Sequence, residues 1–133
     1  MSKYQTLSHE KFIIRYHLIF STKYRKKLLA PIRDDILCSI QRASSLWGHW
    51  KVVVAEIDKD HIHLLVEASP TDRISEIVHT LKQTSTYDIW HSHYEYMRQF
   101  YWKQHHLWTK GYFVSTIGDV SEKILKQYIE NQG

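Results

Sequence analysis

Alternating apolar and polar positions dominate the first half of the chain. Residues 12–21 read FIIRYHLIFS and carry an apolar side chain at every second position from Ile14 to Phe20, which predicts a strand with one apolar face. Residues 32–47 place apolar side chains at helical spacing from Ile32 to Leu46, followed by Gly48, and predict a helix with these residues on its apolar face. The runs WKVVVAEI (50–57) and HIHLLVEA (61–68) flank three polar residues. They predict two strands joined as a hairpin.

The second half of the chain continues with a helix and a short strand. Apolar residues from Ile74 to Leu81 return to helical spacing, and this pattern weakens towards Tyr96. The segment GYFVSTIG (111–118) predicts a fourth strand between two glycines. The order βαββαβ is that of a ferredoxin-like α+β fold. We therefore expect an antiparallel sheet with its helices on one face, the third strand beside the first, and one further helix at the C-terminal end.

Composition indicates one globular domain over residues 1–133. The chain is 43% hydrophobic and 24% charged, with no repeat and no low-complexity segment. No apolar run is long enough to span a membrane, and the first residues lack the apolar core of a secretory signal. The one cysteine, Cys38, suits a reducing compartment, and we expect it to be a small buried residue of the first helix. These observations predict a cytoplasmic protein.

Positive charge is concentrated in the first third of the chain. The net charge is +4, but residues 1–51 hold 10 basic and 3 acidic residues, a balance of +7, against −3 for the remainder. The densest part is TKYRKKLL, and we call its residues 23–27 the basic loop. Its four cations are the predicted contacts to nucleic-acid phosphates, with a merely solvated loop as the alternative: Lys23, Arg25, Lys26 and Lys27.

Two histidines stand at the head of the third strand, in KDHIHLLVEA (59–68). Among ten histidines such a triplet is unsurprising, and His91 and His93 form a second one. Residues i and i+2 share a face of a strand but lie about 200° apart on a helix. Only His61 and His63 are therefore placed to share a ligand from a regular element.

The histidine pair faces away from the apolar side of its strand. Arg15 and His17 of the first strand are predicted to share this open, polar face. Paired imidazoles could hold a divalent ion such as Mn²⁺, Mg²⁺ or Zn²⁺ if a third ligand is present. The alternative is a pair of hydrogen-bonded surface histidines.

The C-terminal stretch GDVSEKILKQYIENQG (118–133) predicts a helix that begins with Asp119 as its N-cap. Tyr128 and Gln132 are separated by four residues and share one face. A tyrosine hydroxyl is a poor nucleophile unless its target becomes more electrophilic, which a metal on a phosphate achieves. We therefore consider Tyr128 a candidate nucleophile and the Gln132 amide oxygen a candidate third ligand. The alternatives are a tyrosine that packs on the sheet and a solvated terminal glutamine.

Four segments in order resemble the single-tyrosine HUH transposases, the TnpA-like enzymes of insertion sequences that move as single-stranded DNA. They are YHLIFSTKYRKKLL, HIH, WTKGYFVSTIG and YIENQ, and the resemblance covers residues 12–132. It implies a ferredoxin-like homodimer that recognises imperfect hairpins near the ends of its element. It also implies cleavage of one strand, with Mg²⁺ or Mn²⁺, to leave a 5′-phosphotyrosine and a free 3′-hydroxyl.

The same resemblance assigns residues. His61, His63 and Gln132 would be the metal ligands and Tyr128 the nucleophile. The tyrosine helix can serve the histidine pair of the partner subunit in this family, which would make Gly118 a hinge.

Two other functions stay open from the sequence. One is an HUH nicking endonuclease of a repeat-associated type, which the compact chain disfavours. The other is a non-catalytic ferredoxin-like nucleic-acid-binding module. Ten aromatic residues between Tyr87 and Phe113, Trp102 among them, could stack on bases in any of these proteins, or fill the core.

Overall fold

A computed structural model describes residues 13–47 and 49–117 of the chain. Its element order confirms the predicted βαββαβ arrangement and divides the second helical region into a long and a short helix. The elements are β1 (Ile14–Ser21), the 3₁₀ turns η1 (Lys23–Arg25) and η2 (Ala30–Ile32), α2 (Arg33–Trp47), β2 (Lys51–Ile57), β3 (His61–Ala68), α3 (Ile74–Ser92), α4 (Tyr94–Met97) and β4 (Phe113–Ile117).

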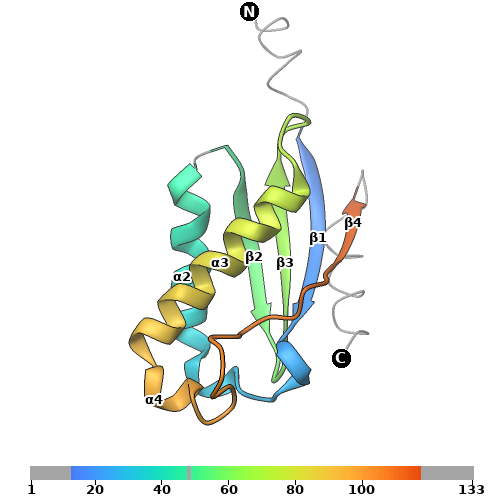
Figure 1. Cartoon of the computed structure of the whole chain (residues 1–133). Coiled ribbons are helices and arrows are strands. Elements are labelled where there is room, and N and C mark those ends of the chain that lie inside the picture. Colours follow the sequence, from blue (N-terminus) through green and yellow to red (C-terminus); the bar gives the residue numbers. More distant parts are fainter. Residues whose placement is uncertain (1–12, 48, 118–133) are drawn as a thin grey trace, which may run out of the picture.

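The four strands form one antiparallel sheet in the order β2-β3-β1-β4 (Figure 1). The two central strands, β1 and β3, pair along their whole length, from Ile14 opposite Ala68 to Ser21 opposite His61. This register places the polar loop that follows β1 beside the hairpin that precedes β3. The strand order is the ferredoxin-like one, as the sequence predicted.

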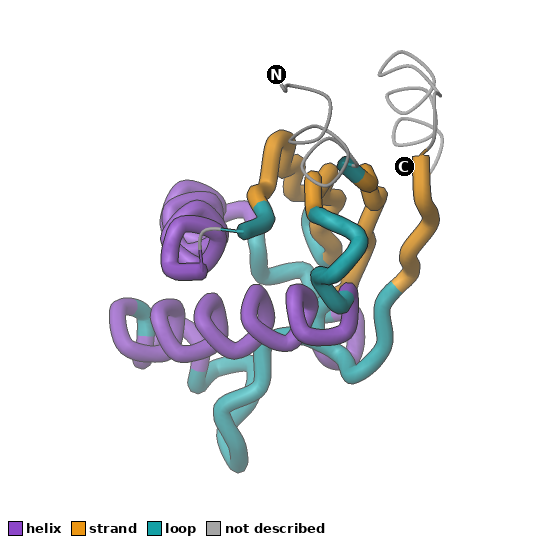
Figure 2. The backbone as a smooth tube through the Cα atoms, turned by 90° about the horizontal axis from the view of Figure 1, so that it is seen from above, coloured by secondary structure: helices purple, strands orange, loops and turns teal. Residues whose placement is uncertain are grey.

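Helices α2 and α3 lie on the same face of the sheet (Figure 2). The strands turn alternate side chains towards them, so Leu18, Ile62 and Leu64 are completely buried. The helices contribute Ile36, Ile40, Ile77 and Leu81 to the same core. Burial of this apolar face is the main favourable contribution to folding, at roughly 25 cal/mol for each Å² removed from water.

Two expectations about α2 were wrong. Leu46 was assigned to the apolar face but is 56% exposed, and Cys38 is exposed rather than buried. The buried stripe of α2 follows Ile36, Ile40 and Ala43. At about 100° per residue, Cys38 lies on the opposite side of the helix and Leu46 at the margin of the stripe.

Lys82 of α3 holds the segment that leads into β4. Its ammonium donates hydrogen bonds to the carbonyl oxygens of Thr109, Lys110 and Gly111 at 2.7, 3.0 and 2.9 Å. The same nitrogen lies 5.3 Å from the centre of the Phe20 ring. These contacts fix the start of β4, an edge strand whose own side chains are mostly exposed. Within residues 13–47 and 49–117, no helix has the length and apolarity needed to cross a membrane.

Candidate active site

The structure brings His61 and His63 together on the side of the sheet opposite the helices. Their ring centres are 4.8 Å apart with the planes at 71°. His17 of β1 joins them, and its ring stacks on His63 at 5.9 Å with an interplanar angle of 11°. The predicted sharing of one face by the three imidazoles is confirmed.

This face is less open than the sequence suggested. The exposed fractions are 9% for His61, 4% for His63 and 1% for His17. Apolar side chains share this side of the sheet: Leu65 packs with Ile117, and the centre of the Phe113 ring lies 6.2 Å from that of the His17 ring in a T-shaped arrangement. The expectation of an open face around the histidines was therefore wrong. At its far end the face is more polar, and Arg15 pairs with Glu67 at 2.9 Å.

Burial keeps the central imidazole neutral. Desolvation, followed by the nearby imidazoles of His61 and His17, lowers the pKa of His63 to about 4. Burial also lowers the pKa of His17. A neutral imidazole is the form that binds a metal ion, so at neutral pH no proton has to leave His63 before binding.

Asp60 orients His61 from the loop that precedes β3. An oxygen of its carboxylate lies 2.8 Å from Nδ1 of His61, and the other oxygen accepts a hydrogen bond from the Arg25 guanidinium at 3.1 Å. Burial alone would raise the pKa of Asp60, but the hydrogen bonds from His61 and Arg25 lower it overall. With an ionised carboxylate at Nδ1, the proton of a neutral His61 sits on Nδ1 and Nε2 is left with a lone pair.

These residues fit a divalent metal ion. Nδ1 of His63 is buried and has no hydrogen-bond partner in the part of the chain that the structure describes. A carboxylate behind one of two adjacent imidazoles is the usual support of a metal-binding histidine. An oxygen of Asp58 also lies 3.7 Å from Nε2 of His61. Within the described ranges, no three His, Cys, Asp or Glu side chains are grouped to hold a metal ion, so a further ligand is still required.

Two of the predicted site residues, Tyr128 and Gln132, lie outside the described residues, as does Gly118. The four cations of the basic loop lie at the end of the sheet next to His61. Arg25 is paired with Asp60, whereas Lys26 and Lys27 are exposed and Lys23 is half-buried. Sequence reasoning missed Asp60 because the residues between β2 and β3 were interpreted only as a turn, although Asp60 directly precedes His61.

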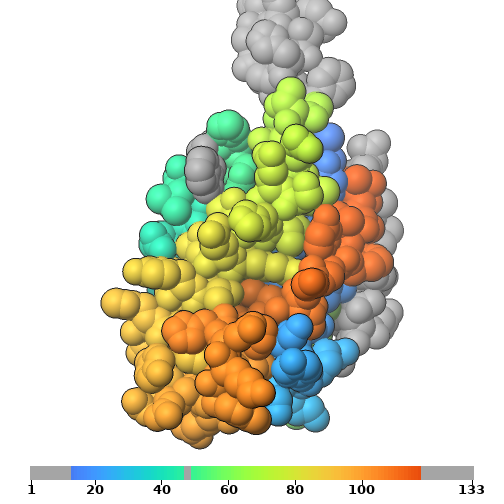
Figure 3. All heavy atoms as spheres, viewed as in Figure 1, coloured from blue at the N-terminus to red at the C-terminus, as the bar shows by residue number. Residues whose placement is uncertain are grey.

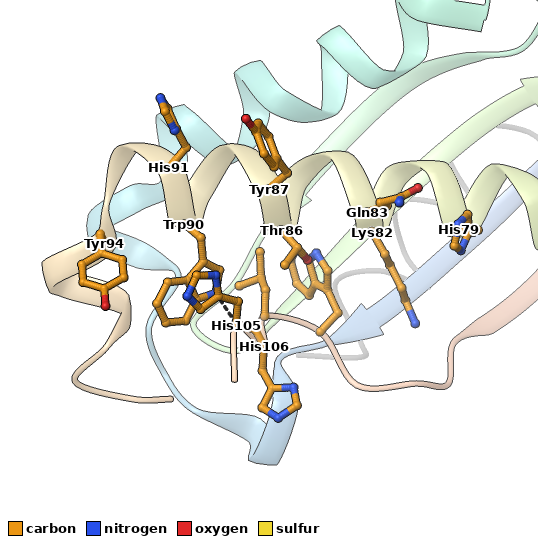
Figure 4. Close-up of a pocket in the computed structure, with 12 residues that line it drawn as sticks. His79, Lys82, Gln83, Thr86, Tyr87, Trp90, His91, Tyr94, His105 and His106 are labelled. Atoms are coloured by element: carbon orange, nitrogen blue, oxygen red, sulfur yellow. Dashed lines mark hydrogen bonds between the residues drawn. The ribbon is translucent and has the colours of Figure 1, made fainter. Parts of the chain in front are cut away.

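A groove lies elsewhere, along α3 on the helical side of the molecule (Figure 4). It has a volume of about 770 Å³ and we call it the Trp90 groove. The Trp90 ring is covered by His105, whose ring stacks on it at 4.0 Å, and the Trp90 indole donates a hydrogen bond to the His106 carbonyl at 2.7 Å. The histidines of the candidate metal site are not part of this groove.

Comparison with known proteins identifies the family. Residues 10–132 match the family described as IS200-like transposases. The chain is 29% identical over 132 residues to the transposase of insertion sequence IS200 from Salmonella typhimurium, covering 99% of this chain and 85% of that protein. It is 30% identical over 119 residues to the ISDra2 transposase TnpA of Deinococcus radiodurans, covering 90% and 84%.

Solved structures agree with this result. A crystal structure of a candidate transposase from Deinococcus radiodurans R1 is similar with a TM-score of 0.72 and 30% identity, over 91% of this chain and 92% of that one. A tyrosine transposase associated with REP sequences, bound to a REP hairpin, has a TM-score of 0.60 at 11% identity, over 86% and 61%, and supports the fold. From the family match over residues 10–132 and these relatives, the chain belongs to the IS200-like transposase family.

Proposed function

We propose that this transposase binds imperfect hairpins in single-stranded DNA at the ends of its element. It cleaves and rejoins strands through a 5′-phosphotyrosine intermediate, with Mg²⁺ or Mn²⁺ as its cofactor. The observation that carries the proposal is the pair of adjacent, buried imidazoles of His61 and His63, with Asp60 behind His61. Two adjacent imidazoles with a carboxylate behind one of them form part of a metal site that still needs an oxygen ligand.

Tyr128 is the proposed nucleophile. Its hydroxyl oxygen forms a bond to the phosphorus, the bond from phosphorus to the 3′ oxygen breaks, and the proton lost by the tyrosine ends on that 3′ oxygen. The DNA 5′ phosphate then remains on Tyr128. Attack by a 3′-hydroxyl reverses these bond changes and rejoins strands without ATP, because the phosphodiester is conserved as a phosphotyrosine.

His61, His63 and the amide oxygen of Gln132 would hold the ion. When bound, a divalent cation supplies Lewis acidity that withdraws charge from the scissile phosphate. Asp60 keeps the His61 ring in one tautomer and one orientation, and the burial of His63 keeps that ring unprotonated. The two proposed histidine ligands thus already lie side by side in the metal-free protein.

Hairpin binding is supported by the basic loop beside His61 and by the REP-associated relative, which is bound to a hairpin.

A homodimer is part of the proposal, and the edge strand β4 offers it an apolar surface, with Phe113 44% and Val114 36% exposed. Sedimentation equilibrium of the full chain should give twice the 16.0 kDa of one chain. A mass of one chain at micromolar concentration would contradict the dimer. We also propose a cytoplasmic location.

The two alternatives are less favoured by the same observations. The named insertion-sequence transposases match at 29–30% identity over most of their length. The repeat-associated relative matches only in fold, over 61% of its chain. A non-catalytic module would not require a buried imidazole pair with a carboxylate behind one ring.

A cleavage assay separates these functions. The purified chain is incubated with end-labelled single-stranded DNA from the ends of its element, with Mn²⁺, Mg²⁺ or chelator, and analysed by denaturing electrophoresis. We expect a metal-dependent covalent adduct that Tyr128→Phe abolishes while hairpin binding persists. Tyr87→Phe, a change at an exposed tyrosine of α3, is the matched control and should retain the adduct. Tight hairpin binding without any adduct would favour the non-catalytic module.

A further inference from the structure

The basic loop contains two non-glycine residues in the left-handed backbone region. Tyr24 has φ 63° and ψ 19°, and Arg25 has φ 53°. Side chains with a Cβ atom adopt this conformation at an energetic cost, so it persists only where the surroundings enforce it. Such strain concentrates at functional positions, and it calls for an explanation in a loop that contains no glycine.

Hydrogen bonds on both sides hold the loop in place. The backbone N–H of Lys23 donates to the Leu107 carbonyl at 2.8 Å, and the Tyr101 hydroxyl donates to the Lys23 carbonyl at 2.7 Å. At the end of the loop, the Thr22 hydroxyl donates to the Lys26 carbonyl at 2.7 Å. The strained conformation is therefore built into the fold, and the Tyr24 ring that it carries lies at the surface.

Tyr24 and Trp102 line one groove of about 410 Å³, which we call the Trp102 groove. Their exposed fractions are 68% and 75%, which are high values for large aromatic side chains. The segments that carry them, near residue 24 and near residue 102, adjoin on the surface shown in Figure 3. A groove lined by two exposed aromatic side chains is suited to a planar ligand.

The charges around the Trp102 groove suit an anion. Lys23 and Lys103 line it, none of its lining residues is acidic, and the Lys23 ammonium lies 5.3 Å from the centre of the Tyr24 ring. Exposed Lys26 and Lys27 follow on the same loop. The Arg25 guanidinium pairs with Asp60 on the side of the candidate metal site. The lysines of the loop are therefore the cations that can contact an anionic ligand in the groove.

The basic loop links the groove with the candidate active site, because Tyr24 lines the groove and the next residue, Arg25, pairs with Asp60 at 3.1 Å. The Thr22 N–H donates to the Asp60 carbonyl at 2.9 Å, and Asp60 is the residue that orients His61. One short loop therefore borders both the histidine pair and the two aromatic rings. The Trp90 groove is less suited to a stacked base, because its tryptophan is already covered by His105.

We propose that the Trp102 groove binds an unpaired nucleotide of the DNA strand, with its base stacked on Trp102 or Tyr24 and its phosphates beside Lys23 and Lys103. Alternating aromatic and basic contacts are how proteins hold single strands without reading their sequence. This inference rests on the proposed function only in taking single-stranded DNA as the substrate.

Binding of a 5′-fluorescein-labelled oligo(dT) tests the proposal by fluorescence anisotropy, with the full chain in chelator so that no strand is cut. Trp102→Ala should weaken binding roughly 5- to 150-fold, which corresponds to the loss of one stacked base. Trp102→Phe should recover most of this loss. Tyr87→Ala removes an aromatic ring that is 67% exposed on α3 and should leave binding unchanged. Unchanged thermal unfolding should accompany each variant.

The salt dependence separates stacking from charge. Lys103→Gln should reduce the slope of log K against log salt by about 0.7, the value for one phosphate of a single strand, whereas Trp102→Ala should leave the slope unchanged. Loss of affinity in Tyr87→Ala but not in Trp102→Ala would overturn the proposal in favour of the Trp90 groove. Failure of the chain to bind oligo(dT) at low salt, or equal competition by blunt duplex DNA, would also overturn it.

The two proposals fail separately. If the chain forms the Tyr128 adduct and Trp102→Ala binds oligo(dT) normally, the proposed function stands and the groove proposal is wrong. If the chain forms no adduct but needs Trp102 to bind oligo(dT), the groove proposal stands and the proposed catalysis is wrong.

Discussion

Asp60 joins two features that the sequence kept apart, the basic loop and the histidine pair. One carboxylate oxygen faces Nδ1 of His61 at 2.8 Å, and the other accepts the Arg25 hydrogen bond at 3.1 Å. Arg25 was predicted to contact phosphates, and that role stays a prediction. The structure adds that Arg25 positions Asp60, which in turn positions His61.

Removal of this support should weaken metal binding. Asp60→Asn lets the His61 ring rotate or change tautomer, so we expect roughly 10- to 100-fold lower affinity for Mn²⁺ by isothermal titration calorimetry. Glu56→Gln is the matched control, because Glu56 is an exposed acid on the strand opposite His63 and has no hydrogen bond to the histidines among the residues described. Equal effects of the two substitutions would mean that only net negative charge matters and that Asp60 does not position His61.

His63 should titrate far below an ordinary histidine. Its pKa is lowered to about 4 by burial and by its imidazole neighbours, against 6.5 for the free side chain. Between pH 6.5 and 4, His63 binds a proton in the unfolded chain but not in the folded chain. The contribution of His63 is therefore favourable above pH 6.5 and is lost as the pH falls through this window. NMR titration of the metal-free protein measures this, and a His63 pKa near 6.5 would contradict the burial argument.

At the scale of elements, Lys82 determines how β4 attaches to the rest of the fold. Its three hydrogen bonds to consecutive carbonyl oxygens hold the approach to this edge strand. The side chains of β4 add little burial of their own. The strand is therefore held by its pairing with β1 and by one lysine of α3.

Lys82→Met should detach the approach to β4. It removes one charged donor shared by three carbonyls, so we expect the free energy of unfolding in urea to fall by about 1–3 kcal/mol. Hydrogen exchange should show faster exchange in Phe113–Ile117 before other strands. Lys110→Met, at an exposed neighbour, is the control and should change little. Unchanged exchange in β4 would show that strand pairing alone holds it.

The elements themselves were largely predictable from the sequence, because periodicity reports burial. The alternation in β1 and the helical spacing in α3 correspond to single faces packed on one core. The end of the second helical region was not predictable, because α3 gives way to α4 at His93 without glycine or proline. Left-handed Tyr24 and Arg25 were also unpredictable, since their conformation is held by hydrogen bonds of the neighbouring Lys23 to the Leu107 carbonyl and from the Tyr101 hydroxyl, both far away in the sequence.

At the scale of the whole molecule, the fold assembles part of the proposed active site. The sheet places two imidazoles side by side, and the loops at its end supply the supporting carboxylate and the cations. The histidine pair was predictable because a strand places residues i and i+2 on one face. Its burial was not, because it depends on side chains of β1 and β4 that meet only in the folded chain, such as His17 and Phe113.

The central claim is that Tyr128 attacks a phosphate activated at the histidine pair. The most direct test is mass spectrometry of proteolytic peptides after reaction with a single-stranded hairpin substrate in Mn²⁺. The account predicts a nucleotide linked through its 5′ phosphate to Tyr128, formed with Mn²⁺, absent with chelator and lost in His63→Ala. A 5′-phosphate adduct on another tyrosine, or an adduct on Tyr128 that forms equally in chelator and in His63→Ala, would contradict it.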